Sequence, residues 1–260
     1  VTAALRDGRS GIRAVPEWAE HDIGPRVAGL ISDLDVSQTI QRKHRRSMGR
    51  VAQLCAVATA QAIADARLDS AFLSSGRVGL ALGSTTGSTE STLGYYANIL
   101  GPGMRANKST AFLQVMSHTC AANAALAFGI TGRVWGPNSA CTSASQGIGL
   151  GFDTLRLGAQ DVMICGGAEE AHFTTAGTFD LVGAASRGFN QTPEMTPRPF
   201  DKRRDGMVVG EGAGVLVLER WDHAVARGAR IPAALLAFAP TCDGEHITSP
   251  SALGMQACME

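Results

Sequence analysis

Two short apolar segments constrain the fold of this chain most strongly. Val78-Gly-Leu-Ala-Leu-Gly83 and Asp161-Val-Met-Ile-Cys-Gly-Gly167 contain almost no polar side chain and are bounded by glycine. Uninterrupted apolar strands are typical of parallel sheets that helices cover on both faces. Residues 50–66 and 142–158 have the apolar spacing of helices and could supply such covers. The sequence therefore predicts a mostly parallel α/β layer structure.

Further elements are expected around these strands. Apolar spacing predicts helices over 88–100, 110–129 and 221–228, and strands over 132–136, 205–210 and 214–219. The first forty residues are interpreted as irregular after a helical pattern over 1–8, and another helical pattern begins at 251. Because both terminal helix patterns look interrupted, we expect the sequence to be a fragment.

Composition excludes several classes of function. Lys and Arg together number 23, as do Asp and Glu, so the charge balance indicates neither nucleic acid nor a membrane surface. No apolar run approaches the ~18 residues of a membrane span. The six cysteines form no CxxC pair and the six histidines lack ligand spacing, so no metal site is predicted. Cysteines in apolar runs favour buried free thiols in a reducing cytoplasm.

Two glycine clusters do not indicate a nucleotide site. Gly147, Gly149 and Gly151 lie inside a predicted helix rather than in a strand-to-helix turn. The cluster at 210–214 lies between two predicted strands. The helical glycines are therefore expected to permit close helix packing. A GxSxG serine-hydrolase motif is also absent from the sequence.

Cys141 is the strongest candidate for chemistry. It lies in Gly136-Pro-Asn-Ser-Ala-Cys141-Thr-Ser, where a helix is expected to begin. The positive end of a helix dipole favours a thiolate, and the free N–H groups of a first turn can stabilise an oxyanion. These features predict a nucleophile that accepts an acyl group. The alternative is a small buried residue at a helix start.

The motifs resemble those of a known family. They comprise Ser139-Ala-Cys141-Thr-Ser-Ala, Asp161 to Glu170, Pro197-Arg-Pro-Phe-Asp201 to Gly214, Ala224 to Ala229 and Cys242 to Pro250. In this order they resemble the elongating β-ketoacyl-acyl-carrier-protein synthases of the thiolase-like superfamily. The resemblance implies an αβαβα layered fold. Residues 1–232 would form the N-terminal domain without its first strand, and residues 233–260 the beginning of the C-terminal half.

The resemblance also implies a reaction. Such acyltransferases move an acyl group from an acyl carrier protein to the cysteine, here Cys141. They then condense it with malonyl-carrier protein after decarboxylation, in fatty acid, polyene or polyketide elongation. No cofactor is expected beyond the phosphopantetheine that arrives on the carrier.

Residue by residue, the resemblance implies three further roles. Phe179 and Thr86, with Thr85 beside it, match positions that line the acyl pocket. Arg42, Lys43, Arg45 and Arg46 match a carrier-docking patch, with Arg105 and Lys108 as weaker candidates. A solvated helix face is the alternative interpretation of the basic run. The family forms homodimers whose interface includes the strand at 133–135, so a homodimer, or a heterodimer with a related synthase, is expected.

One departure from the family is large. The His-Gly-Thr and Gly-His motifs that serve decarboxylation and condensation do not occur here, and His118 and His246 do not match them. We therefore expect the chain alone to accept an acyl group without condensing it. A non-catalytic partner subunit resembling a chain-length factor is the alternative, and a thiolase is a more distant one. Asp201, Asp205 and Glu211 are interpreted as turn and ion-pair residues.

Overall fold

A central four-stranded sheet organises the structure, a computed structural model that describes residues 2–246 and 249–260. Its strand order is β4 (Val134–Trp135), β3 (Val78–Gly83), β5 (Val162–Glu169) and β6 (Gly212–Glu219). β3 pairs in parallel with both β4 and β5, whereas β6 pairs antiparallel with β5. The predicted mostly parallel α/β arrangement is confirmed, and β3 has the predicted bounds.

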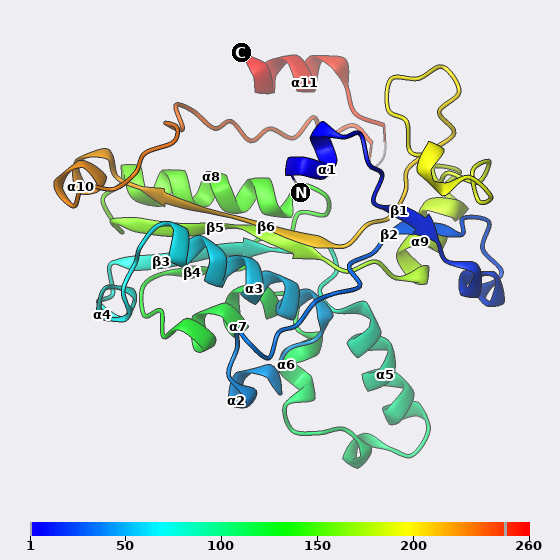
Figure 1. The fold of residues 1–260 in the computed structure, drawn as a ribbon, viewed down its shortest axis with the longest axis horizontal. Helices are drawn as coiled ribbons and strands as arrows, with labels where there is room; N and C mark the ends of the chain where they lie inside the picture. The colour runs from blue at the N-terminus through cyan, green and yellow to red at the C-terminus, as the bar shows by residue number, and fades with distance from the viewer. Residues whose placement is uncertain (1, 247–248) are drawn as a thin grey trace.

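Helices cover both faces of this sheet (Figure 1). α3 (Arg50–Asp65) and α7 (Thr119–Phe128) lie on one face, and α8 (Ser143–Arg156) lies on the other. Leu80, Leu82 and Ile164 pack toward α3 and α7 in the largest core cluster. Ala81, Met163 and Cys165 alternate with them and pack toward α8. Strands buried on both faces explain why these segments carry no polar alternation.

The glycines of α8 allow this helix to lie close to the sheet. A Cβ atom on Gly147 would lie 2.5 Å from the carbonyl oxygen of Ala81, and one on Gly151 would lie 2.2 Å from Cys165 Sγ. Such separations are too short for a real Cβ atom. The expectation that these glycines serve helix packing is confirmed.

Three predicted segments differ from the structure. Residues 110–129 form two helices, α6 (Ala111–Val115) and α7, because Met116 is extended and the Thr119 hydroxyl donates to the carbonyl oxygen of Leu113. The first forty residues include a small antiparallel sheet of β1 (Ile12–Ala14) and β2 (Val27–Gly29). Residues 205–210 form no strand. Gly206 has a φ of 151°, and residues 207 and 210 pair through isolated bridges to different segments.

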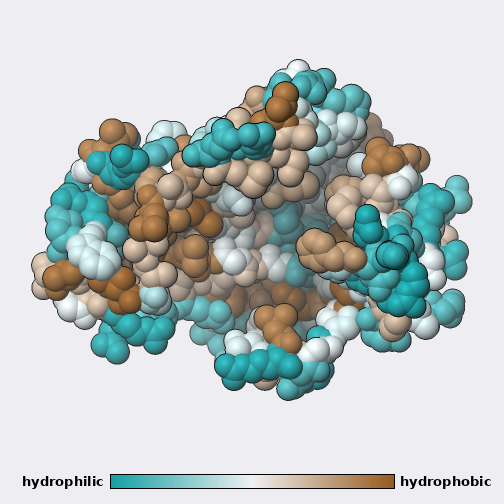
Figure 2. Space-filling view, turned by 90° about the horizontal axis from the view of Figure 1, so that it is seen from above, coloured by the Kyte–Doolittle hydropathy of each residue, from teal (hydrophilic) through white to brown (hydrophobic). Residues whose placement is uncertain are grey.

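The other elements surround this core. They are α1 (Thr2–Arg6), η1 (Pro16–His21), α2 (Arg42–Arg45), α4 (Ser70–Leu73), α5 (Thr89–Leu100), η2 (Met104–Ala106), α9 (Phe173–Leu181), η3 (Pro193–Met195), α10 (Trp221–Ala226) and α11 (Ala252–Met259). The predicted helix start at Val1 and residues 247–248 of the Cys242–Pro250 motif lie outside the described residues. The boundary placed at residue 232 stays a prediction. Figure 2 views the side with α8 and α11 and shows hydrophobic side chains around a hollow.

Candidate functional site

Cys141 lies in a tight turn that leads into α8. Ala140 has a φ of 49°, a left-handed conformation that is uncommon for a residue with a side chain. Ser139 N–H donates to Ser143 Oγ over 2.8 Å, and the Ser143 hydroxyl donates to the Ala140 carbonyl oxygen over 2.7 Å. Two residues after Cys141 the helix begins, as the sequence predicts. The turn therefore places the thiol at the N-terminal end of a helix.

The exposure of Cys141 separates it from most other cysteines. Cys55, Cys120 and Cys165 are buried, whereas Cys141 is exposed, and all are free thiols. Burial raises the pKa of the Cys165 thiol to about 12. The interpretation of Cys141 as a small buried residue is therefore wrong.

A cavity of about 540 Å³ opens beside Cys141 and is called the thiol cavity here. Thr85, Thr86 and Phe179 line it together with the end of β5 and residues 207–214. The structure thus brings the predicted nucleophile and both predicted acyl-pocket residues to one cavity. β3, α8, β5 and α9 each end or begin there, so the carboxyl edge of the parallel strands positions the site.

A second cavity of about 280 Å³ lies between α5 and α9 and is called the threonine chamber here. Its lining consists of Thr85, Thr86, Thr89, Thr92, Thr174, Thr175, Thr178 and Phe179. Phe179 borders both cavities. The chamber was not predicted from the sequence, although the spacing of residues 89 and 92 in α5 and of 174 and 178 in α9 places threonines on one face of each helix.

Two adjacent carboxylates at the end of β5 fix the segment before α5. Glu169 accepts a hydrogen bond of 2.5 Å from Thr85 N–H. Glu170 accepts bonds of 2.9 Å from the Ser88 hydroxyl and from Glu90 N–H. Both carboxylates also border the thiol cavity. They therefore hold the wall that carries Thr85 and Thr86, a role that the sequence analysis did not assign.

Glu211 has the structural role expected from the sequence. Its carboxylate accepts from the Arg50 guanidinium at 2.6 Å and from Ile31 N–H at 2.8 Å, and only 6% of its side chain is exposed. Burial opposes ionisation of Glu211, but these hydrogen bonds outweigh it and lower its pKa. The pair ties β2 and α3 to the start of β6.

Asp201 and Asp205 also have turn and ion-pair roles, as predicted. Asp205 accepts from Gly188 N–H at 2.6 Å and from the Ser186 hydroxyl at 2.7 Å. Asp201 pairs with Arg203 and Arg198, whose hydrogen bonds hold its pKa well below the usual range.

The predicted docking residues lie on and just after α2. Arg42, Lys43 and Arg45 belong to α2, and Arg46 follows it. Arg46 and Lys108 line a third cavity of about 650 Å³ on the side of α5 that carries Ser91 and Tyr95. Arg105 lies in η2 and does not line this cavity. The structure thus brings Arg46 together with one of the two weaker candidates.

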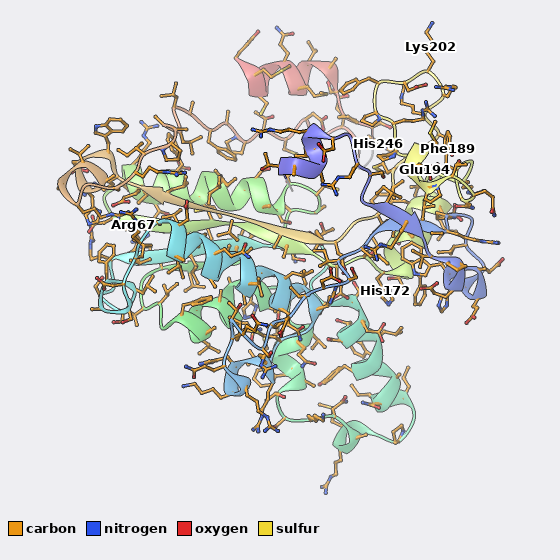
Figure 3. The ribbon with its side chains drawn as sticks, viewed as in Figure 1. Arg67, His172, Phe189, Glu194, Lys202 and His246 are labelled. Carbon is orange, nitrogen blue, oxygen red and sulfur yellow. The ribbon has the colours of Figure 1, made fainter. Side chains whose placement is uncertain are left out.

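Three histidines lie in different segments of the chain, and Figure 3 labels His172 and His246 among them. His118 precedes α7, and a Cβ atom on Gly136 would lie 2.7 Å from its Cβ. His246 accepts a hydrogen bond of 3.1 Å from Ser249 N–H and lies in the segment before α11. His172 precedes α9 beside the start of α5. None of the three lines the thiol cavity.

In residues 2–246 and 249–260, no group of three or more His, Cys, Asp or Glu side chains has an arrangement that could hold a metal ion. Within the same described ranges, no helix has the length and apolar character needed to cross a membrane.

Comparison with known proteins agrees with this geometry. Residues 1–224 match the family described as β-ketoacyl synthase, N-terminal domain. A β-ketoacyl synthase from Burkholderia phymatum superposes with a TM-score of 0.94 and 39% identity, covering 99% of this chain and 64% of that one. The ishigamide ketosynthase/chain length factor superposes with a TM-score of 0.89 and 29% identity, over 99% of this chain and 63% of that one.

The fold and the cysteine turn define a thiolase-like α/β protein. The chain belongs to the β-ketoacyl synthase family. It is 38% identical to 3-oxoacyl-[acyl-carrier-protein] synthase 1 of Haemophilus influenzae and 36% identical to that of Escherichia coli K12. In both comparisons all of this chain is covered, and it spans 64% of the relative's length.

Proposed function

We propose that Cys141 accepts an acyl group from an acyl carrier protein. Its thiolate attacks the thioester carbonyl, the phosphopantetheine sulfur leaves as a thiolate and takes up a proton, and a new thioester forms on Cys141. The observation that carries the proposal is the exposed thiol at the start of α8, which opens into the thiol cavity beside Phe179 and Thr86. The names of the synthase relatives support an acyl carrier protein as the donor.

The proposed pathway continues with elongation. Loss of CO2 from malonyl-carrier protein gives a carbanion that attacks the Cys141 thioester and releases the thiolate. The residues that match the family's histidine motifs are not in this sequence. In our proposal this chain therefore supplies the acylation half of a 3-oxoacyl synthase reaction in fatty acid, polyene or polyketide elongation.

Two surfaces complete the proposal. The basic residues Arg42, Lys43, Arg45 and Arg46 would attract an acidic carrier protein. β4 lies at the edge of the sheet, and Val134 and Trp135 are 45% and 40% exposed. An exposed apolar edge strand favours pairing with a second copy, which supports a homodimer.

Covalent loading tests the proposal. An acyl carrier protein bearing a labelled acyl group is incubated with the full-length protein that contains this chain, and the adduct is located by mass spectrometry. We expect one acyl group on Cys141 and none in Cys141→Ala. Cys242→Ala, which removes another exposed thiol, should load normally. An adduct that persists in Cys141→Ala would overturn the proposal.

A non-catalytic partner role is the second candidate. The similarity to the ishigamide ketosynthase/chain length factor favours it. The exposed Cys141 opposes it. Loading of Cys141 at a rate competent for turnover would exclude this role, whereas a failure to load would support it.

A further inference from the structure

We infer that a bridge between His172 and Glu90 sets the width of the threonine chamber and so selects which acyl chains fit. This inference rests on the proposed acylation of Cys141. The two residues come from opposite walls of the chamber, Glu90 from the first turn of α5 and His172 from the residue before α9. Neither residue lines the chamber itself, so both act by positioning its walls.

The hydrogen bonds of His172 indicate which nitrogen of its neutral ring carries the proton. Its Nδ1 accepts from Thr174 N–H at 3.2 Å and lies 2.8 Å from Thr174 Oγ1. A nitrogen that accepts from N–H carries no proton, so in the neutral ring the proton is on Nε2. Nε2 lies 3.0 Å from Glu90 Oε2 and donates to it. The ring therefore connects the first turn of α9 directly to α5.

The bridge crosses the same gap as the chamber. Thr89 adjoins Glu90, and Thr174 is bound to His172, and both threonines line the chamber. Figure 3 shows His172 between the start of α5 and α9. The His172–Glu90 bridge therefore joins the two helices at this end of the chamber and contributes to the separation between them.

Few other contacts hold α5 in the core. The helix contains no buried residue, and α9 buries only Ala176 and Gly177. At its start, α5 is also held by Glu170, which accepts from Glu90 N–H and from the Ser88 hydroxyl. Glu170 fixes the backbone of the first turn of α5. Of the two hydrogen bonds of Glu90 described above, only the one from His172 connects α5 to the start of α9.

The chamber lining indicates selection by size. The Thr92 hydroxyl donates to the Ser88 carbonyl and the Thr178 hydroxyl to the Thr174 carbonyl, each over 2.9 Å. A hydroxyl bound to the preceding turn of its own helix is not available to donate to a ligand. A chain end in the chamber therefore meets a wall that excludes it by shape, and the separation of α5 and α9 decides how long or branched it can be.

Glu90→Ala is the first test because the Glu90 side chain is 74% exposed and its loss leaves the core intact. The full-length protein is loaded with short, long and branched acyl thioesters on a carrier protein, and the rate constant and half-saturation concentration of Cys141 acylation are measured. We expect the ratio of long- or branched-chain to short-chain loading to rise about 2- to 10-fold, the equivalent of one hydrogen bond. Glu90→Gln keeps an acceptor oxygen for Nε2–H and should retain the wild-type ratio.

His172 provides the reciprocal test. His172→Ala removes the bridge and should shift the ratio in the same direction, whereas His172→Gln offers both an acceptor and a donor and should restore part of the selectivity. Glu17→Ala, a change at another exposed carboxylate in η1, controls for loss of charge. Unchanged chain-length ratios in Glu90→Ala would refute the inference while leaving the proposed function intact. Absence of loading in the wild type with every chain would instead refute the proposed function.

Discussion

Gly147 of α8 faces the carbonyl oxygen of Ala81 in β3 so closely that an added Cβ atom would lie 2.5 Å from it. This contact sets the distance between the sheet and the helix that follows Cys141. Both partners are backbone, so neither can move aside as a flexible side chain would.

Gly147→Ala should therefore destabilise the protein. Overpacking of this kind costs about 1–3 kcal/mol in the free energy of unfolding, measured by urea denaturation. Gly94→Ala is a matched control, because Gly94 lies within α5 and nothing lies within 4 Å of its Cβ position. That substitution should be neutral or should stabilise by up to about 1 kcal/mol through helix propensity. Equal effects of the two changes would contradict the packing argument.

Phe179→Ala should extend the range of accepted acyl chains. Phe179 lines both the thiol cavity and the threonine chamber, so removal of its ring enlarges the space between them. Each additional methylene group that becomes buried contributes about 0.8 kcal/mol, or about four-fold in loading rate. Competition between short and long acyl thioesters for Cys141 measures the change. Phe189→Ala removes a ring that packs against Arg198 instead and should leave the preference unaltered.

Charge reversal at Arg46 and Lys108 should weaken carrier binding. Both side chains line the same cavity beside α5, where they would attract an acidic partner. We expect the Kd of Arg46→Glu/Lys108→Glu for acyl carrier protein to rise about ten-fold or more at low ionic strength, and the difference to narrow as salt is added. Arg67→Glu changes an exposed arginine at the far end of α3 and serves as control (Figure 3). An equal loss of affinity for the carrier protein in Arg46→Glu/Lys108→Glu and in Arg67→Glu would indicate an effect of net charge and contradict a docking surface at this cavity.

The Arg50–Glu211 pair should make stability depend on pH in the acidic range. The folded protein holds the pKa of Glu211 below its ordinary value of 4.5, because the hydrogen bonds from Arg50 and Ile31 outweigh the effect of burial. A lowered folded pKa contributes stability above the ordinary value, and this contribution is lost as the pH falls through the folded value. Glu211→Gln should cost about 1–2 kcal/mol near neutral pH, and this cost should shrink as the pH falls below the ordinary pKa of 4.5. If the free energies of unfolding of the wild type and Glu211→Gln change with pH in parallel, the pair does not contribute in this way.

The sequence predicted the centre of the molecule well. The apolar segments of β3 and β5 were predictable because a sheet covered on both faces buries Leu80 and Ile164 on one side and Ala81 and Cys165 on the other. The turn before α8 was likewise predictable from Cys141 and its small neighbours. These features depend on local sequence, where spacing and side-chain size decide the outcome.

Of the features that were missed, the break between α6 and α7 is local, whereas the others depend on distant partners. The break between α6 and α7 results from a hydrogen bond of the Thr119 side chain, and nothing in the helical spacing of 110–129 indicates it. Residues 205–210 have strand-like composition, but they pair at one end with residues 184–186 and at the other end with Gly29, so no continuous strand forms. The threonine chamber forms only when α5 and α9 meet across about 80 residues of sequence, a separation that no local pattern reports.

The absence of buried residues in α5 has a consequence for how this family of sequences can change. Substitutions on the chamber face of α5 remove little packing from the core, so they should be nearly neutral for folding while they alter the space available to an acyl chain. The helix that follows Cys141, by contrast, contains Gly147, which lies against the backbone of Ala81 and leaves no room for a larger side chain. Evolution can therefore retune the substrate range of such a protein step by step, and each intermediate variant still folds and keeps its reactive thiol in place.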